Sequence, residues 1–428
     1  MSIRELKRAA LAATAGAVIA AGFACPSAQA TEGYFQPGYS AIQKSLAGTG
    51  VANPEDAMTL AINPAGLTSI DEQLEVGLSL FSPARQYSET GGPGFVAPGT
   101  VKSGWNYFAI PYFAYSKPID GHSSWGVAVY GNGGMNTDYP SATNPACGPG
   151  HGVFCGGKAG VNLSQLFISP GYAWNSGNFS LGIAPILAIQ MFSDKGLVAF
   201  SPISASPANL TNNGLSYSYG GGFRAGVEWK LSDTFRLGLS GATPMWMTKF
   251  DKYKGLFADG GAFDIPASVT AGIAWDVAPA WTVMVDYKHI FYSDVPAVGR
   301  STLFTGIPFG AKNGPGFGWS DVDVISLGAD WRVAPNWTLR AGYAHNTNPI
   351  GSNDVTLNIL APGVVTDHVS AGLSWRTGDH SSFDFSAIYV PTHSVSGIEV
   401  TPAGPNPGRT IELSMHQWDA TVGYRYDF

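Results

Sequence analysis

Histidine is the residue type in this chain best suited to acid–base or metal chemistry, and the sequence contains eight of them. A hydrolase needs a nucleophile beside such a base, yet no histidine lies in an HExxH motif and no serine in a GxSxG motif. Four histidines fall in or at the ends of alternating stretches, where a structural role is favoured: His289, His345, His368 and His416. The sequence therefore predicts a protein that is not an enzyme and that needs no metal or cofactor.

Cys147 and Cys155 enclose a short glycine-rich segment, CGPGHGVFC, with His151 between them. Two thiols and one imidazole fall short of the four protein ligands of a structural zinc site, and the spacing is not a zinc spacing. In an oxidising compartment, two such cysteines can close a small loop. We therefore expect a disulfide that staples a surface loop, with a metal site as the alternative.

The N-terminus has the features of an export signal. A basic start is followed by an apolar run over residues 9–24 and then by the small-x-small pattern Ala28-Gln29-Ala30. The apolar run is short for a membrane span of about 20 residues. We predict a signal peptide over residues 1–30; an uncleaved N-terminal anchor is the alternative.

The composition indicates how the rest of the chain is built. Only 12% of the residues are charged, 12% are aromatic and 55 are glycine, while the mean hydropathy is +0.05. Soluble domains carry about 25% charged residues, and no later stretch approaches the roughly 18 apolar residues of a transmembrane helix. Strands that point apolar residues to lipid and small or polar residues to a lumen give this composition. The net charge of −7, without blocks of like charge, argues against nucleic acid as a partner.

From about Glu72 onward, alternating stretches are joined in turn by very short turns and by long polar loops. This asymmetry is typical of outer-membrane barrels, and counting the stretches gives 14 antiparallel strands. The short turns are expected near residues 118–120, 175–177, 232–233, 278–280, 334–336 and 377–379. Tryptophans beside these turns predict an interfacial belt: Trp174, Trp229, Trp275, Trp281, Trp331, Trp337 and Trp375.

Residues 31–71 do not alternate, and they precede the predicted barrel of residues 72–428. The segment holds aliphatic residues such as Val51, Leu60 and Leu67, whereas a disordered tail would normally be more charged and less aliphatic. We therefore predict an ordered plug, or hatch, inside the lumen. A disordered periplasmic tail is the alternative.

Two short motifs in this segment, Glu55-Asp56-Ala57 and Asn63-Pro64-Ala65, resemble the N-terminal hatch of the FadL-type long-chain fatty acid transporters. That family also includes aromatic-hydrocarbon channels. Further similarities, such as residues 281–287 and 337–343, extend the resemblance over most of the mature chain. The resemblance implies a 14-stranded barrel with an internal hatch. It also implies that extracellular loops capture the cargo, that an apolar luminal site holds it, and that it leaves sideways beside a kinked third strand.

Glycines mark the expected position of that kink. The third strand should begin near Ser123 and run into Gly131, Gly133 and Gly134. Glycines weaken and bend strands, so this cluster is the candidate lateral opening; an ordinary glycine-rich loop start is the open alternative. Pro185, inside an otherwise apolar strand, predicts a second kink.

Arginines near the short turns are the expected partners of the hatch. Charges should face the lumen, because an Arg or Lys facing lipid at mid-membrane costs ~2–4 kcal/mol. Charge-assisted hydrogen bonds could then join Glu55, Asp56 and the Asn63 side chain to these arginines. Alternatively, the charges pair only among themselves across the barrel. The predicted partners are Arg236, Arg340 and Arg376.

These inferences predict a channel of the Gram-negative outer membrane that takes up hydrophobic compounds passively, with long-chain fatty acids as the expected cargo, and the family resemblance implies a monomer. An aromatic-hydrocarbon channel, a general hydrophilic porin and a periplasmic or surface-bound β-sandwich are the competing interpretations. The final Tyr426-Asp427-Phe428 resembles the signal that barrel-assembly machinery reads, so that machinery and outer-membrane lipid are expected partners. For a cargo carboxylate the sequence offers Lys158, Lys195 and Lys288 without ranking them.

Overall fold

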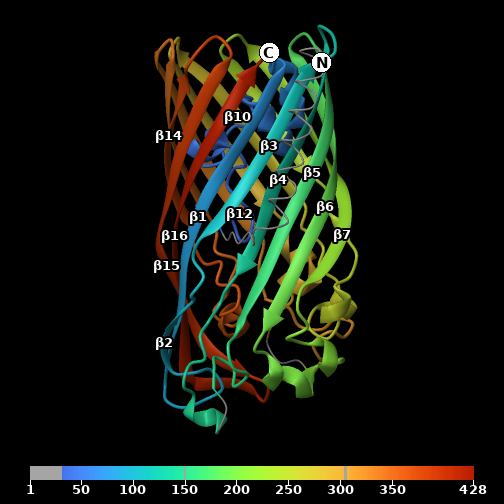
Figure 1. Cartoon of the computed structure of the whole chain (residues 1–428), viewed down its shortest axis with the longest axis vertical. Helices are drawn as coiled ribbons and strands as arrows, with labels where there is room; N and C mark the ends of the chain where they lie inside the picture. Colours follow the sequence, from blue (N-terminus) through green and yellow to red (C-terminus); the bar gives the residue numbers. More distant parts are fainter. Residues whose placement is uncertain (1–30, 149–150, 303–305) are drawn as a thin grey trace, which may run out of the picture.

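The structure is a computed structural model that describes residues 31–148, 151–302 and 306–428; the predicted signal peptide lies outside these residues. Fourteen antiparallel strands form a closed barrel, in which β1 pairs with β3 on one side and with β16 on the other (Figure 1). Two short strands, β2 (Gly99–Lys102) and β9 (Trp246–Met247), add to β1 and β7 without entering the ring. The ring strands are β1 (Gln73–Thr90), β3 (Phe108–Pro118), β4 (Ser123–Asn136), β5 (Gly160–Ser176), β6 (Phe179–Lys195), β7 (Ser216–Ser232), β8 (Phe235–Ala242), β10 (Ser268–Ala278), β11 (Trp281–Ile290), β12 (Val322–Ala334), β13 (Trp337–Asn346), β14 (Asp367–Arg376), β15 (Ser381–Thr401) and β16 (Gly404–Asp427).

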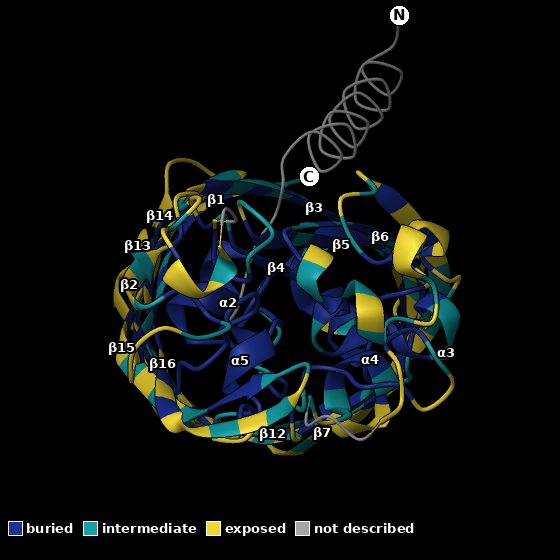
Figure 2. Ribbon diagram, turned by 90° about the horizontal axis from the view of Figure 1, so that it is seen from below, coloured by how far each residue is buried: buried dark blue, intermediate teal, exposed yellow. Residues whose placement is uncertain are grey.

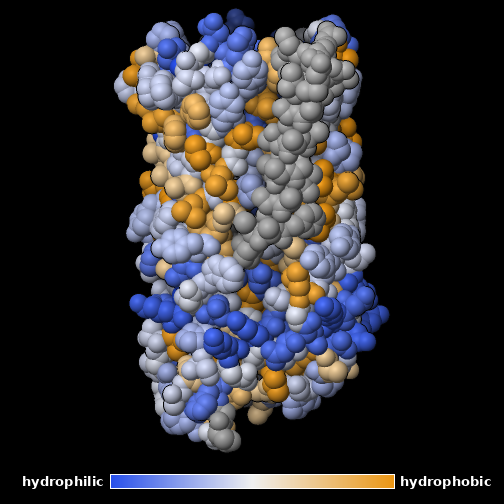
Figure 3. All heavy atoms as spheres, in the orientation of Figure 1, coloured by the Kyte–Doolittle hydropathy of each residue, from blue (hydrophilic) through white to orange (hydrophobic). Residues whose placement is uncertain are grey.

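The predicted strand count and turns are confirmed. Each of the six short turns lies between two strands of the ring, at the end where the C-terminus is drawn in Figure 1. The seven predicted belt tryptophans are all exposed on the outer wall, and two cross-strand pairs stack, Trp281 on Trp331 and Trp337 on Trp375. In Figure 3, hydrophobic residues lie along the wall between this end and a hydrophilic belt below the middle. No helix in the described ranges is long and apolar enough to cross a membrane.

Residues 31–71, here called the luminal segment, lie inside the ring. Their short helices are α2 (Ala41–Ser45), η1 (Ala57–Ala61) and η2 (Pro64–Ser69). Helix α2 contacts β13 to β16, whereas η2 contacts β4 to β7, so the segment reaches opposite walls of the barrel. Figure 2 looks along the barrel and shows α2 within the circle of strands.

Local signals start these helices. The Ser40 side chain accepts a hydrogen bond from the backbone N–H of Gln43 and so caps α2. Asn63 caps η2 in the same way, and Pro64 follows at the first helical position, where its missing N–H costs nothing.

Long loops close the other end of the barrel. They carry η3 (Pro145–Cys147), η4 (Val198–Ile203), η5 (Pro207–Asn209), η6 (Asp251–Tyr253), α3 (Ala258–Gly261), η7 (Tyr292–Asp294), α4 (Pro296–Gly299) and α5 (Val355–Asn358). The loop between β4 and β5 contains the expected disulfide between Cys147 and Cys155, whose Cα atoms lie 5.2 Å apart. The interpretation of these cysteines as a staple is confirmed.

Candidate functional site

Arg340 on β13 joins the luminal segment to the wall. Its guanidinium lies 2.6 Å from a carboxylate oxygen of Glu55 and 2.7 Å from one of Asp330, and its side chain is only 4% exposed. Burial opposes ionisation of Glu55, but the adjacent Arg340 nevertheless lowers the pKa of Glu55 below its ordinary value. Arg425 on β16 adds a hydrogen bond to the backbone carbonyl of Glu55. The structure therefore brings the predicted Glu55–Arg340 pair together.

Arg236 on β8 also binds the luminal segment. It forms an ion pair with Asp276 at 2.7 Å and donates to the Asn53 side chain and to the Ala52 carbonyl. Arg376 does not reach the segment: it is exposed at the end of β14 and donates to the Asp379 carbonyl in the following turn. The prediction for Arg376 was wrong because the residue lies beyond the part of the lumen that the segment fills.

Asn63 binds backbone rather than arginine, which corrects the expected pairing. Its side-chain amide donates to the carbonyls of Val51, 2.7 Å away, and of Val227 on β7, 3.0 Å away. The residues of the barrel wall that the Asn63-Pro64-Ala65 motif contacts most closely are glycines, Gly226 on β7 and Gly182 on β6. A Cβ at Gly226 would lie 2.0 Å from the Asn63 Oδ1, and one at Gly182 would lie 2.3 Å from the Ala65 nitrogen. The Asn63-Pro64-Ala65 turn therefore packs directly on the backbone of β6 and β7.

Asp56 is 2% exposed and accepts a hydrogen bond of 2.5 Å from the Ser40 hydroxyl at the start of α2. It forms no direct ion pair with the predicted arginines. Burial raises the pKa of the Asp56 carboxyl to about 6, although the Ser40 hydrogen bond and the Arg425 charge oppose that shift.

Sequence reasoning missed several anchors. Asp286 on β11 accepts hydrogen bonds from the backbone N–H groups of Gly50 and Val51, at 2.8 and 2.9 Å. Lys44 of α2 forms a buried ion pair with Asp419 on β16 at 2.8 Å. Strand alternation places Asp286 and Asp419 on the luminal face, and that was the available signal.

The three candidate lysines for a cargo carboxylate differ in their surroundings. Lys288 on β11 pairs with the buried Glu32 of the luminal segment at 2.7 Å. Lys195 pairs with Asp138 at 2.6 Å where both side chains are partly exposed, and Lys158 is exposed in a loop. Lys288 is thus the candidate that lies beside the luminal segment.

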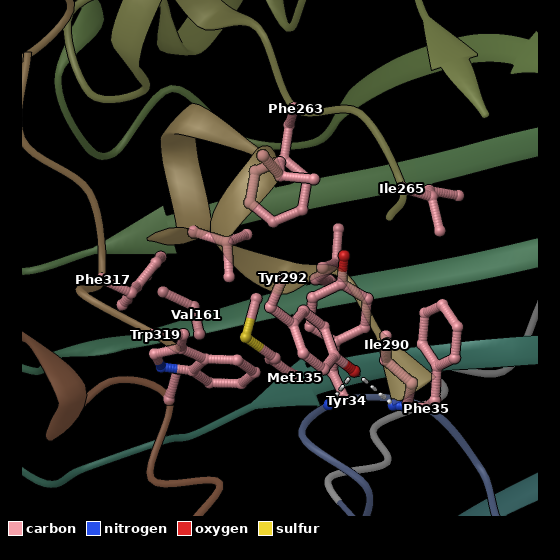
Figure 4. Packing of buried hydrophobic residues seen from close by; sticks show 14 of the residues in the cluster. Tyr34, Phe35, Met135, Val161, Phe263, Ile265, Ile290, Tyr292, Phe317 and Trp319 are labelled. Atoms are coloured by element: carbon pink, nitrogen blue, oxygen red, sulfur yellow. Dashed lines mark hydrogen bonds between the residues drawn. The ribbon is translucent and has the colours of Figure 1, made fainter. Parts of the chain in front are cut away.

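Next to this ion pair, the lumen is filled by aromatic side chains (Figure 4). The rings of Tyr34, Tyr292 and Trp319 lie 5.0 to 5.8 Å apart between centroids, and Phe35 and Phe263 extend the cluster. The Tyr292 hydroxyl accepts hydrogen bonds from the backbone N–H groups of Tyr34 and Phe35 and donates to the Glu32 carbonyl. The start of the luminal segment is therefore part of the apolar cluster.

The glycine cluster of the third ring strand lies at a bulge in β4. The register with β5 shifts between Gly131 and Gly133, and the pairing of β4 with β3 stops at Val129. Luminal residues take up the free edge of β4. The Gln36 backbone N–H donates to Asn132, its side chain donates to Gly131, and the Gly134 N–H donates to Tyr34. A Cβ at Gly133 would lie 1.9 Å from the Tyr34 carbonyl oxygen, so this contact requires glycine.

At the loop end, apolar side chains line a groove between three loops and the end of β15. Phe200 and Ile203 come from the β6–β7 loop, and Phe309 comes from the β11–β12 loop. Leu357 of α5 and Val400 of β15 complete the groove.

A closed barrel with an apolar groove between its long loops, a filled lumen and an N-terminal segment anchored to its inner wall defines a plugged outer-membrane channel. The chain matches, over residues 11–428, the family model described as outer membrane protein transport protein (OMPP1/FadL/TodX), and it belongs to that family. The family consists of transport channels for hydrophobic compounds in the Gram-negative outer membrane.

Individual relatives agree with this assignment. The long-chain fatty acid transport protein of Escherichia coli O6:H1 is 24% identical, with 91% of this chain and 92% of the relative covered. The structure of the Pseudomonas putida toluene transporter TodX matches with a TM-score of 0.69 at 19% identity, covering 92% of this chain and 99% of that one. A Pseudomonas aeruginosa FadL homologue matches with a TM-score of 0.68 at 16% identity, again covering 92% and 99%.

Proposed function

We propose that the protein takes up long-chain fatty acids passively, and that the luminal segment acts as a hatch that releases them sideways. The observation that carries this proposal is the junction at Glu32 to Gln36. These few residues contribute to the aromatic cluster, pair with Lys288 and occupy the free edge of β4. A ligand that enters the cluster therefore meets the residues that fill the wall beside the bulge.

Capture begins at the loop groove lined by Phe200, Phe309 and Leu357. Burial of apolar surface is worth ~0.8 kcal/mol per CH₂, so a chain of about sixteen carbons gains up to ~12 kcal/mol before ordering costs. Binding of that strength would make release slow. Transport therefore needs a change that weakens the luminal site, and displacement of the hatch supplies it.

The Glu32–Lys288 pair offers a trigger. A fatty acid carboxylate that binds Lys288 takes the place of the Glu32 carboxylate, which burial already disfavours as an anion: burial raises the pKa of Glu32 even though Lys288 lowers it. Once Glu32 is released, the adjacent hydrogen bonds from Tyr34 and Phe35 to Tyr292 lose their support. The edge of β4 then becomes free for lateral release.

Aromatic hydrocarbons are the second candidate cargo, because the luminal cluster consists of aromatic rings. A neutral aromatic ring has no carboxylate that could form an ion pair with Lys288, so one variant separates the two cargoes. In cells that lack their own outer-membrane fatty acid channel, Lys288→Met combined with Glu32→Gln, which leaves neither charge of the pair uncompensated, should lower oleate uptake at least tenfold and leave toluene uptake unchanged. Equal oleate uptake by the variant and the wild type would refute the carboxylate trigger. Lys195→Met, at a lysine paired near the loop end, is the matched control.

A further inference from the structure

The ladder between β5 and β6 is interrupted inside the membrane-spanning part of the barrel. Both strands are fully described, and their pairing runs to Ile168 opposite Leu187 and resumes at Tyr172 opposite Ile183. The register is the same on both sides of the gap. Pro170 therefore lies directly opposite Pro185, and three successive residue pairs are skipped.

The two prolines account for the whole interruption. Opposite residues in an antiparallel ladder alternate between pairs that exchange two N–H···O bonds and pairs that exchange none. Proline has no N–H, so a bond-exchanging pair made of two prolines loses both bonds. Each neighbouring pair, Ser169 with Ile186 and Gly171 with Ala184, is normally held by one of these two bonds together with one bond of the next pair along the strand. Loss of the two proline bonds therefore interrupts the pairing of these residues as well. On their other sides both strands stay paired, Pro170 with Val127 and Pro185 with Phe223.

The gap lies within the lipid-facing band. Both prolines are exposed, as are Tyr172, Ile183 and Leu187 around them. Pro170 is four residues from the belt residue Trp174, or about 13 Å along the strand, within an apolar band about 25 Å tall. In lipid, parting two strands normally leaves backbone groups without partners. Over these three pairs there are no ladder bonds to break.

On the luminal side, the gap is covered by Ser169, Gly171, Ala184 and Ile186 and by the luminal segment. The inward residues include Ser169 and Ala184, both fully buried, and the Ser169 hydroxyl has no hydrogen-bond partner. A Cβ at Gly171 would lie 2.2 Å from the Leu60 side chain of η1. Helices η1 and η2 both contact β5, and η2 also contacts β6. The segment that acts as the hatch is thus the inner cover of this seam.

We propose that the seam between β5 and β6 is a second lateral exit for hydrophobic cargo, which opens when η1 and η2 shift. This inference rests on the proposed function, because it takes hatch movement as the event that exposes the seam. This exit differs from the opening at the β4 bulge. The free edge of β4 faces β3 and is taken up by Tyr34 to Gln36, whereas the seam lies between β5 and β6.

The test closes the β3–β4 side first. A Cβ at Gly131 would lie 3.2 Å from the Ile110 side chain of β3, so Ile110→Cys with Gly131→Cys can form a disulfide there. Cys147→Ser and Cys155→Ser are included in every variant, so that the added pair is the one that is oxidised and reduced. We expect the oxidised protein to retain at least one fifth of the oleate and toluene uptake of its reduced form.

Pro170→Ala with Pro185→Ala is then added to restore the two missing N–H donors. Uptake by the oxidised protein should fall at least tenfold further, whereas Pro111→Ala, at a proline on β3 opposite Leu78, should leave it unchanged. The proposal is overturned if the β3–β4 disulfide alone abolishes uptake, or if the double alanine variant loses none of the residual uptake. A wild-type protein that takes up neither compound would instead refute the proposed function.

Discussion

At the scale of single residues, buried charge fixes the luminal segment in place. Arg340 compensates two carboxylates, Glu55 from the segment and Asp330 from the wall, with almost no access to water. Removing one partner from a buried ion pair leaves the other as an uncompensated charge, which typically costs 3–5 kcal/mol. The position of the segment therefore depends on a small number of side chains, and each can be removed separately.

Arg340→Met should loosen the segment. We expect a loss of about 3–5 kcal/mol in the free energy that holds it, seen as faster hydrogen exchange of residues 50–57 and as a higher conductance to small ions in planar bilayers. Arg376→Met removes an arginine at the exposed end of the next strand and should change neither quantity. An unchanged ion conductance of the Arg340→Met variant in planar bilayers would show that the ion pair does not hold the segment.

Asp56 should make the segment sensitive to pH. Its folded pKa of about 6 is raised from an ordinary value of 3.8, so the bound segment favours the protonated acid. The contribution of this group to stability is therefore fully present below the ordinary value and is lost as pH rises through about 6. One pKa unit corresponds to 1.36 kcal/mol, so the loss amounts to about 3 kcal/mol.

Ion leak through the wild-type channel should accordingly rise between pH 4 and pH 7 (about three units around that transition). Asp56→Asn cannot ionise and should remove this rise, while Asp120→Asn, in an exposed turn, should preserve it. Identical pH profiles for wild type and Asp56→Asn would contradict the assignment.

At the scale of elements, glycine decides where the luminal segment can approach the wall. The bulge of β4 admits the Tyr34 carbonyl only because Gly133 has no side chain. Gly133→Ala should expel residues 34–36 from the edge of β4 and raise the leak to small hydrophilic solutes several-fold in liposome swelling. Gly121 lies in the open turn before the same strand, where an added Cβ would meet no neighbouring atom. Liposomes that contain the Gly121→Ala variant should therefore swell at the wild-type rate.

The same scale separates what could be predicted from what could not. The limits of the strands could be predicted from alternation and short turns, because successive residues of a barrel strand face lipid and lumen in turn and this pattern is visible in the local sequence. Alternation also placed Asp286 and Lys288 in the lumen. Their partners, Gly50 and Glu32, belong to a segment without periodicity, so no local pattern could connect them. The prediction for Arg376 shows the converse: its position in β14 is luminal by alternation, yet its side chain binds the Asp379 carbonyl in the following turn instead of the luminal segment.

At the scale of the whole molecule, the luminal segment contacts three parts of the channel at once. Its first residues lie in the aromatic cluster and on the edge of β4, while η1 and η2 cover the seam between β5 and β6. Uptake should therefore require movement at both ends of the segment. A tether far from the ligand cluster tests this requirement without touching the residues that bind cargo.

Thr68 at the end of η2 and Ser180 on β6 provide that tether, because their hydroxyl oxygens lie 3.0 Å apart. With Cys147→Ser and Cys155→Ser present, Thr68→Cys with Ser180→Cys should form a disulfide. We expect oxidised protein to bind oleate as the reduced protein does but to transport it at least tenfold more slowly. Ser326→Cys with Ala344→Cys, which joins two wall strands directly, is the control and should transport normally in both redox states. Normal transport by the oxidised tether would mean that release needs only the first few residues of the segment to move, and the seam would then stay shut.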